Sequence, residues 1–137
     1  MWGGKSKRSA ARIDTLVGQN TEIVGDLSFS GGLHVDGKVR GNVVATTDPH
    51  AIVSISEHGE VEGEVRVPNV LVDGVILGDV FASERLELAP NARVAGNVFY
   101  NLIEMAAGAE VNGKLVHQPG GPKLLELRPP ATETGTG

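Results

Sequence analysis

The chain contains no cysteine among its 137 residues, and aromatic side chains make up only 4% of them. The first absence excludes disulfides and any metal site with thiolate ligands. The second predicts a core of small aliphatic side chains, because hydrophobic residues still account for 40% of the sequence. A chain of this length suits one domain with a continuous core.

Long apolar runs are also missing. No stretch approaches the length of a transmembrane helix, and the N-terminus lacks the apolar segment that follows the basic residues of a signal peptide. We therefore expect a cytoplasmic protein.

Basic charge is concentrated at one end of the sequence. Residues 1–12 carry four basic residues and no acid, whereas the rest of the chain has 17 acids against 8 bases, a net charge of −9. Because nucleic-acid-binding domains present a basic surface, this acidic body argues against nucleic acid as a partner.

What the chain does contain is a repeat. The pattern aliphatic–x–Gly–x–aliphatic occurs eight times, and six of its glycines follow one another at steps of 16, 22, 15, 18 and 17 residues. These six structural glycines are Gly25, Gly41, Gly63, Gly78, Gly96 and Gly113. A period near 18 with strand-type alternation is typical of one small unit stacked on itself, so the sequence predicts a solenoid of short strands. A side chain at each glycine would point into the core near a corner, and glycine leaves room for the bend.

Apolar and polar residues alternate along the body, as half-buried strands require. Leu86 and Leu88, for example, alternate with Arg85 and Glu87. The residue after each repeat glycine is nearly always polar, which predicts a row of polar side chains on one outer face. Residues 102–107 resemble a helix most closely, but they fall where a strand is due and are assigned to one.

The sequence divides into three segments. Residues 1–12 are expected to form a flexible basic tail, and residues 13–118 carry the repeat. Residues 119–137 hold four prolines and end in a Thr/Gly string, which predicts a disordered tail.

The repeat and this layout together resemble the bactofilins, a family of polymer-forming bacterial cytoskeletal proteins. The segments that carry the resemblance are Val39-Arg40-Gly41-Asn42-Val43, Val61-Glu62-Gly63-Glu64-Val65, Val94-Ala95-Gly96-Asn97-Val98 and Val111-Asn112-Gly113-Lys114-Leu115. The resemblance implies an all-β fold, a single-stranded right-handed parallel β-helix of triangular section with about six coils. It also implies end-to-end polymerisation without nucleotide, in a scaffold that positions cell-wall enzymes or other client proteins at the inner membrane.

The N-terminus fits the same family pattern, since several members open with Met, an apolar or aromatic residue and then lysines. We expect Trp2, Lys5, Lys7 and Arg8 to contact an anionic membrane surface. Trp favours the membrane–water interface, and each cation near an anionic surface adds about 1 kcal/mol.

A parallel solenoid has two open ends, each with unpaired backbone groups and a section of apolar core. Neither terminal segment has the composition of a cap, so the sequence predicts self-association through the terminal coils. The residues expected at this polymer interface are Ile13, Leu16, Leu27, Phe29, Phe99, Leu102, Met105, Leu115 and Val116.

No pattern for catalysis, cofactor binding or metal binding is present. The four histidines lack ligand spacing, and no GxxxxGK[ST] nucleotide-binding motif occurs. We therefore expect a protein that is not an enzyme. Two alternatives remain: a trimeric hexapeptide-repeat acyltransferase with His50 as its catalytic residue, and a β-solenoid binding module that uses the outer polar row.

Overall fold

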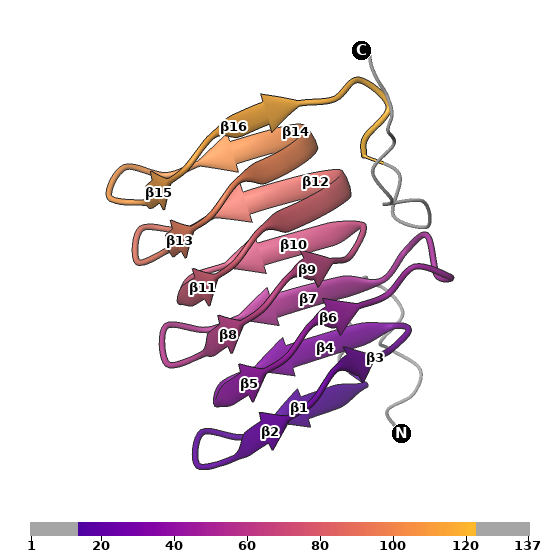
Figure 1. Ribbon diagram of the computed structural model, residues 1–137, viewed down its shortest axis with the longest axis vertical. Helices are drawn as coiled ribbons and strands as arrows, with labels where there is room; N and C mark the ends of the chain where they lie inside the picture. Colours follow the sequence, from indigo (N-terminus) through magenta and orange to yellow (C-terminus); the bar gives the residue numbers. More distant parts are fainter. Residues whose placement is uncertain (1–13, 123–137) are drawn as a thin grey trace, which may run out of the picture.

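The structure, a computed structural model, describes residues 14–122 and contains β-strands but no helix within that range. The strands follow one another around three faces of a solenoid, and every pairing between them is parallel (Figure 1). The all-β parallel solenoid expected from the repeat is therefore confirmed.

Each coil of the solenoid contributes one strand to each face. The first face contains β1 (Thr15–Val17), β4 (Gly32–Val35), β7 (Ile52–Ile55), β10 (Asn69–Val72) and the later parts of β12 (Val80–Leu88) and β14 (Val98–Met105). The second face contains β2 (Glu22–Val24), β5 (Lys38–Arg40), β8 (Glu60–Glu62), β11 (Val75–Leu77), β13 (Arg93–Ala95) and β15 (Glu110–Asn112). The third face contains β3 (Leu27–Ser28), β6 (Val43–Val44), β9 (Val65–Arg66), the early parts of β12 and β14, and β16 (Leu115–His117). The six strands of the second face define six coils.

Two strands are long because they continue around a corner. β12 passes from the third face to the first, and its pairing with β14 shifts register between Ala82 and Arg85. β14 makes the same passage one coil later and runs to Met105, so the strand expected over residues 102–107 is present up to Met105, and Ala106 and Ala107 lie beyond its end.

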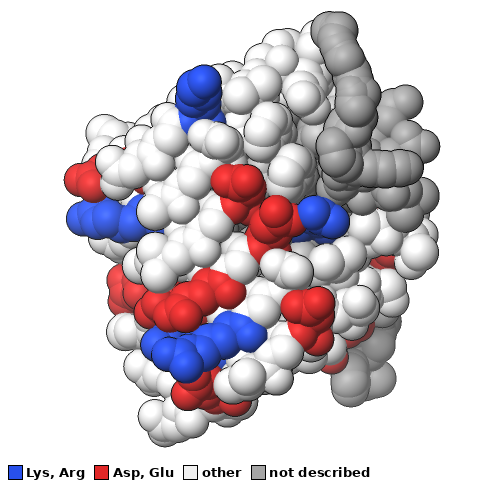
Figure 2. Space-filling model, in the orientation of Figure 1, with Lys and Arg blue, Asp and Glu red and all other residues white. Residues whose placement is uncertain are grey.

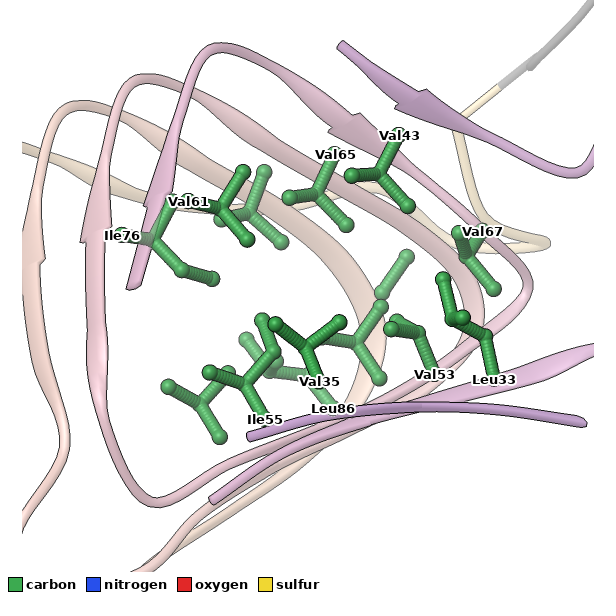
Figure 3. Close-up of a cluster of buried hydrophobic side chains, with 14 of the residues drawn as sticks. Leu33, Val35, Val43, Val53, Ile55, Val61, Val65, Val67, Ile76 and Leu86 are labelled. Carbon is green, nitrogen blue, oxygen red and sulfur yellow. The ribbon is translucent and has the colours of Figure 1, made fainter. Parts of the chain in front are cut away.

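The core is a set of aliphatic columns that run from coil to coil. Residues in register on successive coils point inward together, because parallel strands stack about 4.8 Å apart without changing parity. One such inward column consists of Leu27, Val43, Val65, Val80, Val98 and Leu115. Figure 3 shows the labelled Val, Ile and Leu side chains converging inside the coils, and the buried hydrophobic side chains are all Val, Leu, Ile or Ala.

The six structural glycines also form a column, but for a different reason from the one expected. A side chain on Gly63 would not enter the core. Its Cβ would lie 2.2 Å from the carbonyl oxygen of Gly41 on the preceding coil, and the other internal members of the column make equally close approaches. Glycine is therefore required because the backbones of successive coils meet at this corner.

The polar row beside this glycine column is present and holds neighbouring coils together. The side-chain oxygen of Asn42 accepts a hydrogen bond from the backbone N–H of Glu64 at 2.9 Å, and that of Asp79 accepts one from Asn97 at 2.9 Å. Asp26 and Asn97 make the same contact with the next coil. These side chains thus satisfy corner N–H groups that the strand ladder leaves free.

Candidate polymerisation interface

The first coil pairs with a neighbour on one side only, within the described residues. The N–H groups of Leu27 and Phe29 donate to the carbonyls of the second coil at 2.7 and 3.0 Å. Neighbouring residues of a parallel strand turn their backbone groups to opposite sides. The N–H and C=O of the intervening Ser28 therefore face the open side of the first coil.

The last coil has the same character at the opposite end. The carbonyls of Asn112 and Lys114 accept from the N–H groups of the preceding coil at 3.1 and 2.8 Å. The backbone groups of Gly113, which lies between them, face outward from the stack. Among the described strands, none pairs with this outer side of β15 or β16.

Each end also exposes part of the aliphatic core. Leu115 and Met105 end two inward columns and are 44% and 45% exposed, whereas Val98 and Leu88, one coil earlier, are 0% and 2% exposed. At the first coil, the inward residues Ile23, Leu27 and Phe29 are only partly buried against the core. The two ends therefore expose apolar surface that a further coil would cover.

The structure places the residues expected at the interface in three positions. Leu27, Phe29, Met105 and Leu115 lie on the open ends, in inward columns. Leu16, Leu102 and Val116 belong to the terminal coils but point to the flanks, with Leu16 and Leu102 exposed and Val116 half-buried. Ile13 lies outside the described residues.

Phe99 occupies a different place from the one expected. It belongs to the fifth coil and points outward, where its ring stacks on Phe81 with a centroid distance of 4.7 Å and an interplanar angle of 4°. Val116 of the last coil follows it in register. Phe99 therefore lies on the third face and not on the open end.

The register adds further inward residues to the two ends. Ile23 and Val111 are the first and last members of one inward column of the second face, and both pack against the core. His117 ends the column that contains Ala82 and Tyr100, and its ring lies 5.5 Å from that of Tyr100. The C-terminal end therefore carries an imidazole at the end of one inward column.

His50, the residue of the acyltransferase alternative, lies in the exposed loop between β6 and β7. Its backbone N–H donates to Asp48 at 3.0 Å, and the other carboxylate oxygen of Asp48 accepts from Gly31 at 2.8 Å. These hydrogen bonds, that from Gly31 first, hold the pKa of Asp48 below its usual value. In residues 14–122, no three His, Asp or Glu side chains are arranged to hold a metal ion.

Charged side chains on the flanks are mixed in sign. Figure 2 shows acidic and basic residues interleaved on the side in view, without a continuous basic area among the described residues. On the second face, Arg40 lies 3.1 Å from Glu22 and 3.5 Å from Glu62, and Arg93 lies 3.5 Å from Glu110. The part of the chain that the structure covers has no helix long and apolar enough to cross a membrane.

Comparison with known proteins gives one consistent result. Residues 15–116 match the family model described as "Bactofilin: Polymer-forming cytoskeletal". The chain is 27% identical over 109 residues to Bactofilin BacO of Myxococcus xanthus (strain DK1622), covering 80% of this chain and 83% of BacO. It is 28% identical over 112 residues to Bactofilin BacP of the same organism, covering 81% of this chain but 45% of BacP. No solved structure matches the chain.

The family match spans five complete coils and nearly all of the sixth, from β1 into β16. It therefore includes both open ends as well as the glycine column. The chain belongs to the bactofilin family of polymer-forming cytoskeletal proteins.

Proposed function

We propose that this protein is a scaffold subunit that assembles end to end, through its first and last coils, into filaments that need no nucleotide. The filament binds the inner membrane peripherally through the N-terminal segment and positions cell-wall or morphogenesis proteins. Catalysis has no part in this function.

The observation that carries the proposal is that both ends of the solenoid expose core side chains and unpaired backbone groups. Both present inward columns whose last side chains are partly exposed, together with backbone groups that face away from the stack. Stacking one end on another continues the strand ladder and covers these side chains in a single step. The hydrophobic effect and the new hydrogen bonds therefore favour the same arrangement.

Sedimentation of the purified, unmodified chain tests this assembly. We expect the protein to pellet above a critical concentration, and added ATP or GTP to leave that concentration unchanged. A chain that stays in the supernatant as a monomer at every concentration would contradict the proposal.

Membrane binding rests on Trp2, Lys5, Lys7 and Arg8, which lie outside the described residues. One tryptophan and a few cations bind an anionic surface weakly, but a filament presents many copies of them side by side. Valency thus converts a weak anchor into an effective one.

The corresponding test is co-sedimentation with vesicles of anionic lipid. Deleting residues 2–8 is expected to release the polymer from the vesicles without preventing its assembly. A variant in which Lys5, Lys7 and Arg8 become Gln while Trp2 is kept separates the charge contribution from that of the indole. Unchanged vesicle binding by the deletion variant would show that the N-terminal segment is not the membrane anchor.

The positioning of client proteins follows from the cytoskeletal character of the family. The polar row of the binding-module alternative is a weak candidate for the client surface, because Asn42, Asp79 and Asn97 already accept hydrogen bonds from the next coil. The flanks of the assembled filament and the terminal segments are better candidates for the surface that binds client proteins.

A further inference from the structure

The third face carries an outer column that differs from those of the other two faces. Val44, Arg66, Phe81, Phe99 and Val116 lie in register on five successive coils, and all are half-buried. The Phe81 and Phe99 rings stack, and the Arg66 guanidinium lies 5.5 Å from the centroid of the Phe81 ring. The column thus combines stacked aromatic rings with a cation on the flank of the solenoid.

Arg66 is only partly satisfied in this column. Its Nη2 pairs with Glu64, but its buried Nε has no hydrogen-bond partner among the described residues. All the described strands belong to the coils themselves, so no strand lies over this face. A segment with an acidic side chain between apolar ones would complement the Arg66 guanidinium and the apolar side chains beside it.

The chain after β16 leads toward this column. Gln118 donates to the carbonyl of Tyr100 at 2.8 Å, and the Gly120 N–H donates to the Asn101 side chain at 3.2 Å. Gly121 then lies against the previous coil, where a Cβ on it would be 2.0 Å from the carbonyl oxygen of Ser83. The segment therefore turns back along the stack (Figure 1), and Pro122 is buried at its end.

This path fixes where the following residues begin. Ser83 is two residues beyond Phe81 in β12, at the corner that borders the third face. The next six residues are Lys-Leu-Leu-Glu-Leu-Arg, positions 123–128, which lie outside the described residues. Six extended residues span about 20 Å, or about four coil spacings, which is enough to reach Phe81, Arg66 and Val44.

We propose that residues 123–128 bind in cis as an extended segment over the outer column of the third face, with Leu124 against Phe81 and Glu126 paired with Arg66. The segment then covers the apolar flank and brings a carboxylate to the Arg66 guanidinium. This inference goes beyond the proposed function and does not depend on polymerisation.

Engineered disulfides test the placement directly, because the chain has no cysteine of its own. Arg128→Cys, which shares a side of the extended segment with Glu126, is combined with Val44→Cys on the third face or, as the matched control, with Ile52→Cys on the first face. Val44 and Ile52 are both half-buried, outward-pointing β-branched residues on opposite sides of the same corner. We expect the Val44 pair to form its disulfide at least tenfold faster than the Ile52 pair, and Glu126→Lys to slow it.

Two results would overturn the proposal. One is equal disulfide formation by the two pairs. The other is formation only between chains when separate Val44→Cys and Arg128→Cys proteins are mixed, which would place the segment on a neighbouring subunit. Thermal melting under reducing conditions checks that each variant is folded.

A second measurement does not depend on cysteines. Replacing Leu124, Leu125 and Leu127 with Asp is expected to uncover the column and to raise the binding of an apolar fluorescent dye severalfold. Replacing Thr132, Thr134 and Thr136 with Asp adds the same charge farther along the segment and is expected to leave dye binding unchanged. Equal dye binding by the two variants would contradict the proposal.

Discussion

Leu115→Arg tests the end-to-end contact at a single side chain. Leu115 ends an inward column on the last coil and remains 44% exposed. Full burial of a leucine side chain contributes about 1.5–3 kcal/mol, so covering the exposed part contributes roughly 1 kcal/mol to assembly. Arginine loses this contribution and places a cation between two coils, where an unpaired charge costs several kcal/mol more.

The substitution has a much smaller effect on the separate protomer. The aliphatic part of an arginine side chain can lie along the open end while its guanidinium stays in water. We expect the protomer to lose about 1 kcal/mol, a fall in Tm of roughly 5 °C. Assembly is expected to lose at least about 3 kcal/mol, which corresponds to a rise of about 100-fold in critical concentration.

The assay is sedimentation over a range of protein concentrations, with circular dichroism melting of the supernatant. Leu77→Arg is the matched control, because Leu77 is 45% exposed but points outward from the fourth coil, far from either end. We expect this control to polymerise as the unmodified chain does. Polymerisation by Leu115→Arg at the normal concentration, or equal disruption by Leu77→Arg, would refute the reasoning.

Three further predictions concern the protomer. Gly63→Ala puts a methyl group 2.2 Å from a backbone oxygen and is expected to cost about 2–4 kcal/mol in thermal or urea unfolding, whereas Gly18→Ala, with its nearest neighbour at 3.6 Å, should change little. Phe99→Ala removes the aromatic stack and is expected to cost at least about 0.5–1.5 kcal/mol in unfolding, while electron microscopy shows normal end-to-end assembly. The pKa of Asp48 is lower in the folded state, so its contribution to stability is fully present above the ordinary value of 3.8 and is lost as the pH falls through the folded-state value. The Tm difference between the unmodified chain and Asp48→Asn should therefore shrink in acid, and a difference independent of pH would be evidence against this contribution.

The sequence predicts the structure of each coil well, but it predicts less well which residues lie at the ends of the stack of coils. The glycine period and the alternation of apolar residues predict the strands, the parallel solenoid and the inward columns. These features repeat in every coil, so irregularity in one coil does not obscure them. The corner loop at residues 46–50 contains the additional residues of the 22-residue step, and the strands on either side of it keep their register.

Phe99 illustrates what the sequence does not resolve. It lies near the C-terminal limit of the repeat, which suggested an end position, but β14 continues past it into the last coil. Residue order along the chain does not say which coil a residue closes, because strands such as β12 and β14 run through corners. The register places Phe99 in an outward column with Val116, and Leu115 in an inward column with Val98.

The glycines show the same limit in another form. Parity alone suggested that a side chain at these positions would enter the core. The actual constraint is the carbonyl oxygen of the preceding coil, which comes from a residue 15 to 22 positions away. Such contacts between coils depend on how closely the corners stack, and a pattern within one coil carries no information about that distance.

Negative-stain electron microscopy of the purified chain without nucleotide tests the central claim most directly. Open ends on both terminal coils predict long, unbranched filaments, shortened or absent in Leu115→Arg and unchanged in Leu77→Arg. Discrete particles of uniform size in the unmodified protein would contradict the account, because they would mean that the two ends are closed.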